Sequence, residues 1–89
     1  MVLNASHRFI EHLKLFVRNQ IEDRCVNNDY LKQCRISLNE LNSLIDCQKI
    51  QSAFDDLIQL SKLPDKTRLH EQQIYIENLI SHTVHSSSA

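Results

Sequence analysis

Apolar residues recur at steps of three and four along the first part of the chain, with charged residues on the opposite side. This pattern is typical of an amphipathic helix, and it predicts one over residues 6–26. Ser6 is the expected N-cap, and Asn27 and Asn28 supply the turn that ends the helix, because asparagine tolerates the left-handed conformation. The stripe consists of Phe9, Ile10, Leu13, Phe16, Val17, Ile21 and Cys25.

A second helix is predicted over residues 29–45, with Asp29 near its start. Its apolar stripe includes Leu38, Leu41, Leu44 and Ile45. Within it, Ser37 precedes Glu40 by three residues, which is the spacing of a capping box. Two interpretations stay open: one continuous helix, or a helix that is broken near residue 36 and begins again.

The second half of the chain predicts two more helices, over residues 48–62 and 66–83. Residues 46–48 form the break before the first of them. Pro64 disfavours helix at the residue before it, and Asp65 is the expected cap of the last helix. The fold class is therefore all-α: a small antiparallel bundle of three to four helices, with a single domain over 1–84 and a flexible C-terminal tail over 85–89.

Glycine is absent from all 89 residues, and this changes the range of functions to expect. Phosphate-binding loops, dinucleotide-binding turns and nucleophile elbows all need glycine where the backbone turns sharply or approaches a ligand closely. We therefore do not expect an enzyme.

Charge and cysteine content indicate an intracellular, soluble protein. The net charge is −1, so no excess of basic residues attracts nucleic acid, and no apolar run is long enough for a signal peptide or a membrane span. Three cysteines at positions 25, 34 and 47 form no paired motif, so we expect a reducing, cytoplasmic setting and packed, inert thiols. Cys47 is the strongest candidate for a reactive thiol, because it falls at a predicted helix start.

Two histidines near the end of the chain are the candidate metal ligands. His82 and His85 are three residues apart and share a helix face, as paired metal ligands do. A zinc site needs three or four ligands, and no cysteine or carboxylate lies one turn away. We expect neither a metal nor a cofactor.

Residues 38–57 resemble a helix-turn-helix, and they supply one alternative function: a dimeric DNA-binding transcription regulator. Its base-contacting residues would open the second helix: Gln48, Lys49, Gln51 and Ser52. Asn42 and Asp46 depart from the small residue and the glycine that this motif usually carries, and Asp55 and Asp56 would repel phosphates. Nucleic acid is thus the second choice of partner.

Protein interaction is the first choice. Large apolar residues widen the stripe of the first helix, and three in succession on the last helix cannot all face one core. We predict a regulatory or adaptor protein that binds another protein, as a homodimer, because a bundle this small gains most from association. The predicted contact residues are Phe9, Leu13, Phe16, Ile74, Tyr75 and Ile76.

Overall fold

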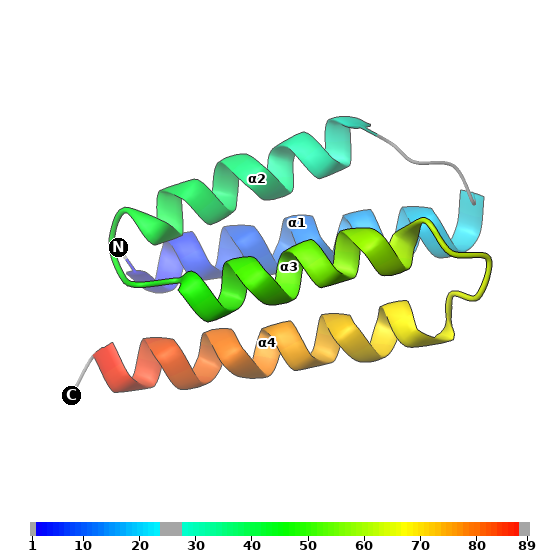
Figure 1. Ribbon diagram of the computed structural model, residues 1–89. Helices are drawn as coiled ribbons and strands as arrows, with labels where there is room; N and C mark the ends of the chain where they lie inside the picture. The colour runs from blue at the N-terminus through cyan, green and yellow to red at the C-terminus, as the bar shows by residue number, and fades with distance from the viewer. Residues whose placement is uncertain (1, 24–27, 88–89) are drawn as a thin grey trace.

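The computed structural model describes residues 2–23 and 28–87, and within them the chain forms four helices and no strand (Figure 1). Their bounds are α1 Val2–Asp23, α2 Asn28–Asn42, α3 Gln48–Ser61 and α4 Thr67–Ser87. The all-α prediction is confirmed, with four helices rather than three.

Successive helices run in opposite directions, so the start of α1 and the end of α4 lie at the same end of the molecule (Figure 1). The bundle is elongated, 40 × 21 × 16 Å. Its closest helix pairs are α1 with α2, α3 with α4, and α1 with α4. Helix α1 therefore has close neighbours on both sides, and its seam with α4 brings together the two ends of the sequence.

One apolar core runs through the bundle and takes residues from all four helices. Helices α1 and α3 contribute five buried apolar residues each, and on α1 they include the fully buried Phe9, Leu13 and Phe16. The ring of Phe9 meets the ring of Phe54 on α3 edge to face, with centroids 5.6 Å apart and planes at 76°. This aromatic contact links the first and third helices across the core, in a geometry that aromatic quadrupoles favour.

The ends of the chain are more helical than the sequence predicted. Ser6 is not a cap: it lies within α1, is buried, and donates its hydroxyl to the carbonyl of Leu3 at 2.9 Å. Helix α4 continues to Ser87, so residues 85–87 belong to it and not to a tail. Residues 24–27 and 88–89 lie outside the described part, including Asn27 of the predicted turn, while Asn28 opens α2.

Helix α2 is one continuous helix through residue 36 and is not broken there. Ser37 starts no new helix: it is buried inside α2 and donates its hydroxyl to the carbonyl of Gln33 at 2.9 Å. A hydroxyl bound to the preceding turn is a usual arrangement for serine inside a helix. The helix ends at Asn42, before the predicted limit of 45, so Leu44 and Ile45 belong to the turn.

Aspartates satisfy backbone N–H groups at the starts of α3 and α4, which was predicted for Asp65 but not for Asp46. Asp46 accepts from the N–H of Gln48 at 3.1 Å, and Asp65 accepts from the N–H of Thr67 at 2.9 Å. Asp29, by contrast, lies inside the first turn of α2. The first N–H groups of a helix have no partner within it, so these carboxylates replace the missing acceptors.

Candidate functional site

The residues predicted to form the interaction surface lie in two different environments. Phe9, Leu13 and Phe16 on α1, and Ile76 on α4, are fully buried in the core. They cannot touch a partner while the bundle stays closed, which corrects their assignment as contact residues. The stripe of α1 is wide because this helix packs against two close neighbours, α2 and α4.

Ile74 and Tyr75 are exposed, by 46% and 54%, but they do not form one surface. Consecutive residues on a helix point about 100° apart. Tyr75 shares a shallow hollow with Ser52 and Asp56 of α3 and so lies on the α3 side of α4. Ile74 is one helical turn from His70, which borders a hollow against α1.

The predicted DNA-contacting residues begin α3: Gln48, Lys49 and Ser52 are exposed and Gln51 is half-buried. A helix-turn-helix needs its two helices to cross at a steep angle and pack together. Here α2 and α3 run in opposite directions (Figure 1), and they are not among the close helix pairs. Asp56 also borders the hollow that contains Lys49. This geometry gives no support to the helix-turn-helix alternative.

The described thiols lie in the core. Burial raises the pKa of Cys34 to about 12, and burial together with the charge of Asp46 raises the pKa of Cys47. Both groups therefore favour the protonated thiol, which is the unreactive form. Cys47 is indeed the residue before α3, but that position is buried; Cys25 lies outside the described residues.

No metal centre forms in the described part of the chain, where no three histidine, cysteine or acidic residues come together. His82 and His85 both lie on α4, although His85 was placed in the predicted tail, and both are exposed.

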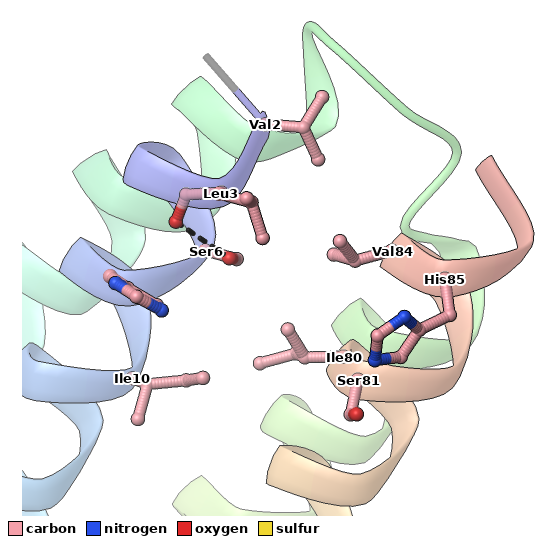
Figure 2. Close-up of a pocket in the computed structure, with 9 residues that line it drawn as sticks. Val2, Leu3, Ser6, Ile10, Ile80, Ser81, Val84 and His85 are labelled. Carbon is pink, nitrogen blue, oxygen red and sulfur yellow. Dashed lines mark hydrogen bonds between the residues drawn. The ribbon is translucent and has the colours of Figure 1, made fainter. Parts of the chain in front are cut away.

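An apolar hollow lies where the first turns of α1 meet the last turns of α4, and we call it the end groove (Figure 2). Its volume is about 440 Å³. The apolar residues that line it are Val2, Leu3, Ile10, Ile80 and Val84. Figure 2 shows Ile10 of α1 and Ile80 of α4 pointing toward each other. Val2 and Val84 also point toward each other, closer to the end of the bundle.

Four polar residues border the end groove: Ser6, His7, Ser81 and His85. The ring of His85 points toward the space between the helices (Figure 2). Among the described residues that line this groove there is no aspartate, glutamate, lysine or arginine. The groove is thus lined mostly by apolar side chains, with the buried Ser6 inside it and the exposed His7, Ser81 and His85 at its edge.

Farther along the same seam, Lys14 of α1 faces Glu77 of α4, with Nζ and Oε1 4.0 Å apart. Beyond this pair is a second hollow of about 360 Å³, bordered by Ile21, Arg18 and His70 among others. Ile21 is 41% exposed. We call Ile21, His70 and Ile74, with the neighbouring Lys14 and Arg18, the seam patch.

The sequence pointed to helices α1 and α4, but it missed the residues that form these two features. Leu3, which is 61% exposed, lies before the predicted start of the first helix. Val84 and His85 lie at or beyond the predicted end of the last. Only the extended helices bring them together, so no sequence signal could have marked them as a site.

No known protein family matches this chain, and neither does any curated protein or solved structure. Within the described residues, no helix has the length and apolar character needed to cross a membrane. Function must therefore be inferred from the geometry of the bundle.

Proposed function

We propose that this protein is a small protein-interaction module, with a regulatory or adaptor role, and that it acts as a homodimer through the seam patch. The observation that carries the proposal is the exposure of Ile21 and Ile74 on the two helices that form the seam. Both remain outside a core that is already filled from all four helices. Ile21 lines the second hollow, and Ile74 lies one helical turn from His70, which also lines it. Exposed apolar side chains that gather in one place are typical of an association surface.

A second copy is the occupant that the charges favour. The net charge of −1 leaves little repulsion between two chains. On the α1 side of the patch lie Lys14 and Arg18, together with Glu22, which pairs with Arg18. Glu77, beside the patch on the α4 side, pairs with Lys14. A two-fold axis along the seam would place the α1 side of each copy over the α4 side of the other, so basic groups would face an acidic group.

Sedimentation of the purified chain, from micromolar to millimolar concentration, tests this proposal. We expect a dimer for the unaltered protein and a monomer for Ile74→Asp, because two buried carboxylates would then face an apolar surface. Ile36→Asp is the matched control, since Ile36 is similarly exposed but lies on α2. Helical circular dichroism should stay the same in all three proteins.

Two results would contradict the proposal. One is an unaltered chain that remains monomeric at millimolar concentration. The other is an Ile36→Asp variant that loses the dimer as completely as Ile74→Asp does.

A further inference from the structure

We propose that the end groove is a binding site for a small anionic amphiphile: a molecule with an unbranched apolar chain and a carboxylate head, such as a medium-chain fatty acid. This inference does not depend on the proposed dimer, because the groove and the seam patch share no residue: the groove lies at the start of α1, and the patch extends from Lys14 toward the end of that helix.

The size and base of the groove fit the apolar part of such a ligand. Small-molecule sites usually have volumes of about 300–1,000 Å³ and are mostly apolar, with a few polar groups that fix the orientation. The end groove has about 440 Å³, and side chains of Ile10, Ile80 and Val84 form its base. These residues come from two helices that flank the space, so an extended chain can lie along the seam between them (Figure 2).

The edge of the groove selects the head group. His7, Ser81 and His85 offer N–H and O–H donors, and an imidazole also carries positive charge when it is protonated. A carboxylate accepts hydrogen bonds only, so it matches this set. Because no described lining residue is acidic, a carboxylate meets no like charge, whereas an ammonium head would find no counter-charge.

Titration by NMR or calorimetry with three ten-carbon probes below their micelle concentrations tests the head group: decanoate, decanol and decylammonium. We expect decanoate to bind most tightly and decylammonium least tightly. Shortening the carboxylate should weaken binding by about four-fold per methylene, which is the fold-change that burial of one such group gives. Equal binding of all three probes, or no binding of decanoate, would overturn the proposal.

Two pairs of variants locate the site. His7→Gln combined with His85→Gln should reduce the preference for decanoate over decanol, whereas His82→Gln should not, because His82 is exposed on the same helix but does not line the groove. Ser81→Phe should block the groove and abolish binding, whereas Ser52→Phe, on an exposed position of α3, should not. Equal losses within either pair would place the probe elsewhere and overturn the assignment.

The titration is repeated in Ile74→Asp, so that failure of the dimer and failure of the ligand site are distinguished. We expect decanoate to bind this variant as it binds the unaltered protein. If groove resonances instead shift with protein concentration alone, and decanoate does not compete, a second copy fills the groove and the ligand proposal is wrong.

Discussion

Gln20 of α1 donates its side-chain amide to the backbone carbonyl of Ser61 at the end of α3, with a distance of 3.1 Å between nitrogen and oxygen. The glutamine is almost completely buried. The same carbonyl also accepts from the ammonium of Lys66 at 2.7 Å. One acceptor at the end of a helix thus joins α1, α3 and the α3–α4 connection.

Replacement of Gln20 separates packing from hydrogen bonding. Gln20→Ala should lower the free energy of unfolding by about 2 kcal/mol, because it leaves a cavity. Gln20→Met keeps the volume, and Ser61 keeps Lys66 as a donor. It also removes Oε1, which has no hydrogen-bond partner among the described residues. We therefore expect Gln20→Met to lower the free energy of unfolding by no more than about 1 kcal/mol. Urea unfolding measures both, with the exposed Gln59→Ala as control. Equal losses for Ala and Met would contradict this account.

The edge-to-face contact of Phe9 and Phe54 predicts an energetic coupling between α1 and α3. A double-mutant cycle with Phe9→Leu and Phe54→Leu keeps both sites apolar and limits the cavities. We expect a coupling energy of about 0.5–1.5 kcal/mol, as for other aromatic pairs. The matched cycle of Phe54→Leu with Val84→Ala should give none. Strict additivity of the two phenylalanine replacements would show that the ring contact contributes nothing beyond burial.

Cys34 predicts that the protein becomes less stable in alkali. Burial raises the pKa of its thiol to about 12 in the folded chain, whereas an unfolded cysteine ionises near about 8.5. The stabilisation that this thiol contributes is fully present below the pKa of cysteine in the unfolded chain. Between the unfolded and folded pKa values, the free energy of unfolding falls by about 1.4 kcal/mol per pH unit as pH rises, because only the unfolded chain releases the proton in this range. Urea unfolding at several alkaline pH values should show this slope, reduced in Cys34→Ala.

Ser37→Ala is the control for that slope, since Ser37 is buried nearby on α2 but does not ionise. It should shift the stability at every pH and leave the slope unchanged. A slope in Cys34→Ala equal to that of the unaltered protein would mean that the thiol ionises without opening the bundle.

Asp65 predicts a loss of stability in acid. Hydrogen bonds from the backbone and side chain of Thr67 hold the pKa of this carboxyl below its usual range, and the charge of Arg68 acts in the same direction. Its contribution is complete above the unfolded pKa, and it is lost as pH falls through the lower folded value.

Thermal unfolding of two variants separates the cap from the charge. At neutral pH, Asp65→Ala should unfold at a lower temperature than the unaltered protein, while Asp65→Asn, which can still accept from Thr67, should lie closer to it. In acid the advantage of aspartate over asparagine should disappear. If Asp65→Ala unfolds at the same temperature as the unaltered protein, the cap does not stabilise α4.

Helices α3 and α4 show how far the sequence alone could go. The apolar steps of residues 48–62 predict α3 to within one residue at its end, and the sequence also predicts Asp65 as the cap of α4. Such features are local, because helical periodicity and capping depend on residues that are only two to four positions apart in the sequence. The same reasoning failed at Ser6, where a good capping residue lies one turn inside a longer helix.

The tertiary structure decided which apolar side chains remain exposed. Helical periodicity gives the direction in which Phe16 or Ile74 points, but it does not say whether another helix covers that direction. The sequence predicts that both Phe16 and Ile74 contact a partner, but Phe16 is buried in the core of the bundle and Ile74 is exposed. The end groove exists because the first turns of α1 and the last turns of α4, at opposite ends of the sequence, lie side by side. The sequence thus determined the helices and their turns, which arise from near neighbours, while only the packing of four helices determined which apolar residues stay available.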